Sequence, residues 1–182
     1  MTGATPDRHR GTVLIRRETL DDADAVHAVT AAAFARPGSP DVAEARLLTE
    51  LRDCDAWLAG LSLVAVVEDV VVGHVVCSRG RVADTPVLAL GPLSVLPGRQ
   101  RRGVGLALMH TVLGAADALG EPLVALLGAP GYYARFGFRL AGEYGIVPPV
   151  PEWRPHFQVR TLSAYDPEIR GTFAYPEPFE RV

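Results

Sequence analysis

The feature that most constrains this chain is the stretch Leu90–Leu108, LGPLSVLPGRQRRGVGLAL. Its apolar first half predicts a buried β-strand, and a loop rich in glycine and arginine follows. Val104, Leu108 and Val112 then repeat at the spacing of one helix face. A strand, a glycine loop and an amphipathic helix in this order favour an α/β fold in which the loop presents a helix N-terminus to a ligand.

The beginning of this helix has the properties of an anion-binding site. A helix N-terminus leaves several N–H groups unpaired and carries a partial positive charge. Gly103 and Gly105 remove side chains that would block those N–H groups, and Arg101 and Arg102 add positive charge beside them. The sequence therefore predicts a phosphate-binding loop at the start of this helix.

Two familiar phosphate-binding loops do not match. All 18 basic residues are arginine, so the chain has no lysine for a P-loop, and none for Schiff-base catalysis. The dinucleotide fingerprint G-x-G-x-x-G fails at Leu108, and the following strand offers no acid for a ribose. A plain glycine turn into a helix remains as the alternative without a ligand.

Periodicity predicts the other elements and a mixed sheet, which indicates an α/β layered domain. The predicted strands are Val13–Arg16, Leu63–Val67, Val70–Val76, Val87–Val95, Leu123–Leu127, Phe138–Glu143 and Phe157–Leu162. Helices are expected over about 20–34, 41–52, 104–119 and 132–136. Glu68-Asp69 is expected to be a hairpin turn, Thr85-Pro86 a break, and Gly91-Pro92 a bulge or edge within its strand.

Length and composition predict a single soluble domain. The chain has 182 residues, 48% of them hydrophobic, with a net charge of −3, which argues against a nucleic-acid protein. We expect a mobile tail at 1–11, one domain over 12–165, and a proline-rich, irregular C-terminal tail, 166–182, packed on that domain. No apolar run is long enough for a membrane span, and two cysteines without C-x-x-C spacing predict a cytoplasmic protein with reduced thiols.

Two motifs carry a resemblance to a known family. Gln100–Gly105 matches [QR]-x-x-G-x-[GA], and Ala129–Phe138 reads APGYYARFGF, with a tyrosine four residues before Gly-Phe. Over about Val13–Leu162 the chain resembles the GCN5-related N-acetyltransferases (GNAT family). The resemblance implies the GNAT fold, a mixed, mostly antiparallel central sheet of about seven strands flanked by helices.

The resemblance also implies a co-substrate, acetyl-CoA, and a place for it. The strands Val87–Val95 and Leu123–Leu127 would splay apart, so that the pantetheine arm pairs with backbone between them as a false strand. Tyr133 is the implied general acid for the leaving thiolate, or else a packing residue beside it. The implied cofactor-binding residues are Leu93, Ser94, Val95, Gln100, Arg101, Arg102, Gly103, Val104, Gly105 and Leu106.

The general base and the acceptor are open. Leu88–Gly91 holds no acid where some family members place a glutamate, and the remaining candidates His74, Glu44 and Glu143 are not distinguished. The loop Phe34–Pro40 and the segment Tyr144–His156 are expected to flank the acceptor. Three aromatic residues either line the acceptor pocket or belong to the core: Trp57, Trp153 and Phe157.

The expected activity is acetyl transfer from acetyl-CoA to an amine of a small molecule or peptide, by direct attack. A non-catalytic acyl-CoA-binding sensor with the same fold is the alternative, and a nucleotide-dependent oxidoreductase is disfavoured by Leu108. No residue cluster has metal-ligand spacing, so no metal is expected. Neither nucleic acid nor membrane is expected as a partner, and the protein is expected to be a monomer or homodimer.

Overall fold

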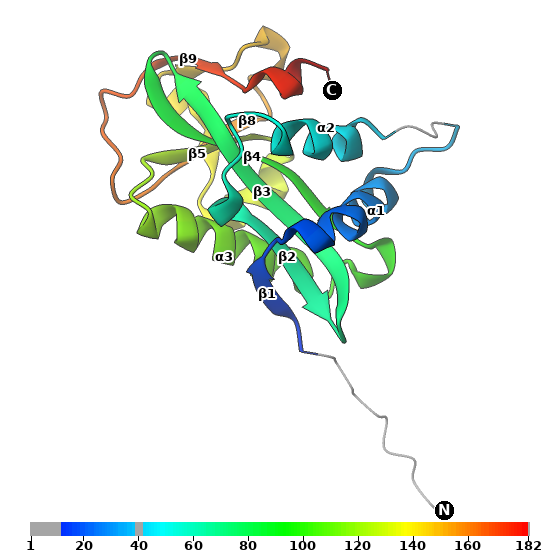
Figure 1. Ribbon diagram of the computed structural model, residues 1–182. Coiled ribbons are helices and arrows are strands. Elements are labelled where there is room, and N and C mark those ends of the chain that lie inside the picture. Colours follow the sequence, from blue (N-terminus) through cyan, green and yellow to red (C-terminus); the bar gives the residue numbers. More distant parts are fainter. Residues whose placement is uncertain (1–11, 39–41, 182) are drawn as a thin grey trace, which may run out of the picture.

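A mixed sheet organises residues 12–38 and 42–181, the part of the chain that this computed structural model describes (Figure 1). The predicted tail 1–11 lies outside the described residues. In the described part nine strands form the sheet, in the order β1-β2-β3-β4-β5-β8-β6, while β9 pairs with β3 and β7. The strands are β1 (Leu14–Arg17), β2 (Ser62–Val67), β3 (Val70–Val82), β4 (Thr85–Val95), β5 (Leu123–Leu127), β6 (Arg139–Leu140), β7 (Ile146–Val147), β8 (Phe157–Thr161) and β9 (Gly171–Ala174). Only the pairs β4–β5 and β7–β9 are parallel among these, so the predicted mostly antiparallel fold is confirmed.

Two consecutive hairpins form the middle of the sheet. Glu68 and Asp69 both have positive φ, as a two-residue hairpin turn requires, which confirms the predicted turn between β2 and β3. The predicted break at Thr85-Pro86 is wrong. The turn comes at Ala83 and Asp84, β3 runs on to Val82, and Pro86 is the second residue of β4, near the strand end where a missing N–H is tolerated.

Helices cover both faces of these hairpins. Residues alternate along β2, with Leu63 and Ala65 packing in the same core cluster as helix α3, and Val64 and Val66 in the cluster of helices α1 and α2. Because alternate residues face opposite sides, α3 lies on one face of the sheet, and α1 and α2 lie on the other (Figure 1). The helices are η1 (Leu20–Asp22), α1 (Ala23–Phe34), α2 (Ala43–Arg52), α3 (Val104–Ala118) and α4 (Pro130–Tyr133), which continues as η4 (Ala134–Phe136).

The C-terminal segment contributes a strand that the sequence pattern does not signal. β9 pairs with the far end of β3, where Val82 lies opposite Phe173, and Figure 1 shows this segment in red beside the β3–β4 hairpin. Phe173 is fully buried among Phe157 and other residues of a second core cluster. The weak strand expected over Phe138–Glu143 is reduced to the two residues of β6, because a 3-10 helix follows from Ala141.

Candidate functional site

The sheet opens where β4 and β5 diverge. The two parallel strands pair only at Leu88–Val124 and Ala89–Ala125, although β4 continues to Val95. The register of β3 and β4 shifts beside Gly91-Pro92, which confirms the predicted bulge. A cavity of about 660 Å³ lies at the opening. It is lined by Ala33, Phe34, Leu93, Val95, Gln100, Arg101, Gly103, Gly105, Leu106, Tyr132, Tyr133 and Arg135.

The glycine loop presents the N-terminus of α3 to this cavity. Gly103 is the N-cap residue with φ +88°, and no side chain caps the helix. The first helical bond runs from the N–H of Ala107 to the carbonyl of Gly103, so the preceding amides of the first turn have no partner within the helix. A Cβ at Gly105 would point to the cavity side and lie 3.0 Å from the Tyr132 hydroxyl. Glycine therefore keeps this helix end open to an anion.

A side-chain bond fixes the loop to the cavity strand. The Gln100 side-chain amide donates to the carbonyl of Val95, at 3.1 Å. Arg101 reaches the left-handed region, with φ +58°, and its side chain lies at the cavity while Arg102 is exposed outside the lining. The loop thus combines a backbone held in one conformation with positive charge.

The two adjacent tyrosines have different environments. The Tyr132 ring lies under the guanidinium of Arg135, 5.0 Å from its centre, and Arg135 Nε donates to the Tyr132 carbonyl. Tyr133 packs edge-on against Tyr132 and Phe138, and a Cβ at Gly128 would overlap its ring. Burial, with Tyr132 adding to it, raises the pKa of Tyr133 to about 12. The Tyr133 phenol is therefore protonated at neutral pH and able to donate a proton.

Most of the residues expected at the site lie together, and three do not line the cavity. The side chain of Val104 is buried in the core, and that of Arg102 is exposed outside the lining. Ser94 is also buried, with its hydroxyl 3.0 Å from that of Thr30 in α1. Ser94 points to the opposite side of β4 from Leu93 and Val95, so its side chain does not line the cavity, and its assignment as a cofactor-binding residue stays a prediction.

The candidate bases and aromatic residues lie elsewhere. Glu44 is beside Arg36, at 3.7 Å, and Glu143 is paired with Arg139 at 2.9 Å. No acidic or histidine side chain is among the described residues that line the cavity. Trp57, Trp153 and Phe157 lie in or against core clusters, away from the cavity lining. The segment Tyr144–His156, expected to flank the acceptor, contains β7 and borders a separate hollow of about 400 Å³. Its place beside the acceptor stays a prediction.

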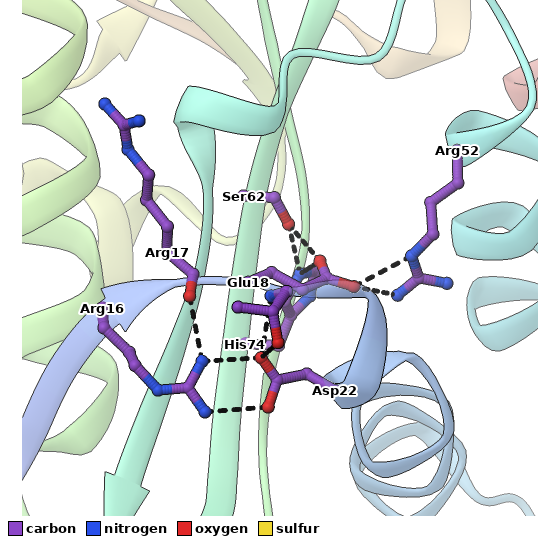
Figure 2. A network of polar contacts seen from close by, with 8 residues as sticks. Arg16, Arg17, Glu18, Asp22, Arg52, Ser62 and His74 are labelled. Atoms are coloured by element: carbon purple, nitrogen blue, oxygen red, sulfur yellow. Dashed lines mark hydrogen bonds and ion pairs between the residues drawn. The ribbon is translucent and has the colours of Figure 1, made fainter.

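A buried polar network is the largest feature that sequence reasoning missed (Figure 2). Glu18, between β1 and η1, accepts from Arg52 Nε at 2.9 Å and from the hydroxyl of Ser62. Its carboxylate is also 3.1 Å from Nε2 of His74, and Glu18 and His74 are 5% and 0% exposed. No motif or spacing joins these four residues, which come from four separate parts of the chain.

The network has the residue types of a hydrolytic triad without its geometry. The Ser62 hydroxyl and the Glu18 carboxylate both meet the same nitrogen of His74, so no carboxylate orients the ring from its other side. A carboxylate only accepts, so Nε2 carries the proton, and Nδ1 has no partner among the described residues. Full burial also removes the serine from any substrate, and the network is structural.

The electrostatics of the network favour a fixed charge at Glu18. Burial alone would raise the pKa of Glu18, but hydrogen bonds from His74 and Ser62 and the charge of Arg52 lower it to about 2. Burial lowers the pKa of His74, against the opposing influence of Glu18, so the ring is neutral. Beside it, Arg16 donates to both oxygens of Asp22 and holds the pKa of that carboxyl well below its usual range.

The described residues form neither a metal centre nor a membrane-spanning helix. Over residues 12–38 and 42–181, no three His, Cys, Asp or Glu side chains come together as a metal site would need. Within those ranges, no helix is both long and apolar enough to cross a membrane.

Comparison with known proteins agrees with this geometry. Residues 29–138 match the acetyltransferase (GNAT) family, which is more than half of the chain. The uncharacterized N-acetyltransferase YhbS of Escherichia coli K12 is 33% identical over 177 residues, covering 93% of this chain and 99% of that protein. The uncharacterized N-acetyltransferase YjhQ of the same organism is 32% identical over 145 residues, covering 75% of this chain and 80% of YjhQ.

Two solved structures share the whole fold. The crystal structure of E. coli YhbS in complex with CoA superposes with a TM-score of 0.86 at 29% identity, covering 99% of this chain and 97% of that one. A GNAT family acetyltransferase from Brucella melitensis, in complex with acetyl-CoA, gives a TM-score of 0.76 at 32% identity, covering 93% and 99%. The predicted fold and acyltransferase class are thereby confirmed, and the chain belongs to the GNAT family of acetyltransferases.

Proposed function

We propose that this protein transfers the acetyl group of acetyl-CoA to an amine of a small molecule or peptide by direct attack. The observation that carries the proposal is the opening between β4 and β5, which ends at an uncapped helix N-terminus. The cavity at this opening offers an anion-binding loop, which suits the pyrophosphate of acetyl-CoA. It also holds the protonated phenol of Tyr133, which suits the thioester.

The binding mode follows from the unpaired backbone at the opening. Beyond Ala89, no strand of the described residues pairs with β4 on the β5 side, so the backbone at Leu93 and Val95 is free to pair with the amide groups of a pantetheine arm. The pyrophosphate then meets the amides of residues 101–106 at the start of α3. Gln100 already occupies one lone pair of the Val95 carbonyl, which leaves the second for a ligand. The site fits acetyl-CoA at each of these points.

Tyr133 has the properties of the proton donor to the departing thiolate. Its raised pKa, about 12, keeps the phenol protonated, so its O–H is available to the sulfur as the C–S bond breaks. Because a thiol has a lower reference pKa, about 8.5, complete proton transfer to a free thiolate is uphill, and the phenol acts by donating its O–H to the negative charge that develops on the sulfur in the transition state. Gly128 lets the ring pack closely, which holds the hydroxyl in one orientation. The proton of the attacking amine leaves to water, because the described lining offers no carboxylate or imidazole to accept it.

The test is a thiol-release assay with acetyl-CoA and a panel of amines, amino acids, polyamines, aminoglycosides and peptides, with the acetylated product identified by mass. Release of CoA with one class of amine, and acetylation of its nitrogen, is the expected result. Acetyl-CoA binding in calorimetry without release for any amine would overturn the enzyme proposal. That result would favour the acyl-CoA sensor, which the absence of acidic and histidine side chains from the described lining also allows.

A further inference from the structure

One hydrogen bond joins helix α1 to the strand at the cavity. Thr30 Oγ1 and Ser94 Oγ lie 3.0 Å apart, and both residues are 0% exposed. Among the described residues, this is the only side-chain hydrogen bond between α1 and the sheet. Val26 and Val29 of the same helix are also buried.

The two hydroxyls belong to two elements that both line the cavity, α1 and β4. Ala33 and Phe34 line the cavity, and they follow Thr30 by three and four residues, on the same helix face. Leu93 and Val95 line it from β4, on either side of Ser94. The hydrogen bond therefore sets the position of the α1 wall relative to the strand wall.

We infer that Thr30 and Ser94 are positioning residues. They hold the α1 residues that line the acceptor side of the cavity, Ala33 and Phe34, in a fixed position relative to β4, beside which the thioester would lie. This inference rests on the proposed function for its catalytic consequence. The physical basis is the directionality of the bond. Apolar contacts tolerate a small slide of α1 along the sheet, but a buried hydroxyl that loses its partner is left unsatisfied. Reacting atoms need near-contact alignment, and a shift of about 1 Å can lower a rate about 100-fold.

The test separates stability from alignment by removing one hydroxyl or both. Thr30→Val and Ser94→Ala each leave a buried hydroxyl without a partner, so each single variant should melt several degrees lower. The double variant removes both hydroxyls, and a pair replaced by apolar groups of similar shape is nearly neutral for stability. We expect the double variant to recover its melting temperature while kcat, measured with the best amine of the panel, stays roughly 10- to 100-fold low. Acetyl-CoA affinity by calorimetry should stay close to that of the wild type.

Two matched controls accompany these variants. Ser78→Ala removes a fully buried β3 hydroxyl that has no hydrogen-bond partner among the described residues. Val82→Ala removes core packing at the far end of β3. Both should keep the kcat of the wild type, the second despite a lower melting temperature. A double variant that recovers kcat together with its melting temperature would show a merely structural pair and overturn the inference.

A second measurement needs no turnover. Hydrogen exchange at the amides of residues 31–34 should be faster in the double variant than in the wild type, with α3 unchanged. Unchanged exchange in α1 would overturn the inference even if activity fell. If the wild type releases no thiol with any amine, the proposed function fails, and the exchange experiment still decides whether the hydroxyl pair holds α1 in place.

Discussion

Replacing Glu18 by glutamine should make the protein less stable at neutral pH and remove part of its sensitivity to acid. The substitution keeps the shape of the side chain and removes the charge that Arg52, Ser62 and His74 surround. A pKa that falls from 4.5 in the unfolded chain to about 2 in the fold corresponds to about 3 kcal/mol, at about 1.4 kcal/mol per pH unit. Since Arg52 is partly exposed, we expect about 2–3 kcal/mol in practice.

The sign of the pH dependence follows from the direction of that pKa. Because the folded state binds the proton less readily than the unfolded chain, the contribution of Glu18 is complete above about pH 4.5 and disappears as the pH falls towards about 2. Urea unfolding of the wild type and Glu18→Gln, from about pH 7 to pH 3, should show a gap in the free energy of unfolding that narrows with acid. A gap that stays constant across this range would refute the reasoning.

Two controls isolate the carboxylate. The same pair of proteins in a His74→Gln background removes the titration of the imidazole, which shares a hydrogen bond with Glu18. Glu50→Gln removes a carboxylate that pairs with Arg181 at 3.0 Å on the surface, where ion pairs contribute less than about 1 kcal/mol. Equal losses for Glu18→Gln and Glu50→Gln would mean that burial of the network contributes nothing.

The remaining predictions concern the proposed site. Gly105→Val should weaken acetyl-CoA binding at least tenfold in calorimetry, about 1.4 kcal/mol, because its side chain fills the approach to the helix amides, with the melting temperature nearly unchanged. Tyr133→Phe should lower kcat by roughly 10²–10⁴ while acetyl-CoA affinity is unchanged, and Tyr132→Phe should lower kcat little. A larger loss of kcat in Tyr132→Phe than in Tyr133→Phe would show that Tyr133 is not the general acid. Phe34→Ala should raise the acceptor KM and Trp153→Phe should not, since only Phe34 lines the cavity; a loss of acetyl-CoA affinity in Phe34→Ala would contradict that placement.

The glycine loop could be predicted from sequence because its information is local. The helix periodicity after Val104 and the glycines of the loop are signals that extend over only a few residues, and they correctly predicted the start of α3. The turn residues Glu68 and Asp69 correctly predicted the β2–β3 hairpin in the same way. The faces of β4 could not be assigned so simply. The bulge at Gly91-Pro92 shifts the alternation, so Ala89 and Ser94 face the same side although they are five positions apart, as their β3 partners Ser78 and His74 show.

The network around Glu18 and the Thr30–Ser94 bond were not predictable by the same means. Their partners are separated by up to 64 residues. They meet because β1, β2 and β3 pair and because α1 and α2 pack onto one face of that sheet (Figure 2). A single buried glutamate or threonine has no periodic signature, and pairing between them is decided by the tertiary fold. The strand β9 was missed for a related reason, because four residues in a proline-rich segment gain their conformation from β3 and not from their own propensity.

The short β4–β5 pairing affects where the sheet opens first when the protein fluctuates. A typical sheet loosens from its rim, but here a pairing of only two residue pairs also lies in the interior of the sheet, between β4 and β5. Amides of this pairing should exchange faster than those of β2 and β3, which are paired along their length. A ligand that binds between β4 and β5 contacts the parts of the sheet on both sides of this pairing. Because it binds only the folded protein, its binding raises the melting temperature, which can therefore be used to follow occupancy of the site.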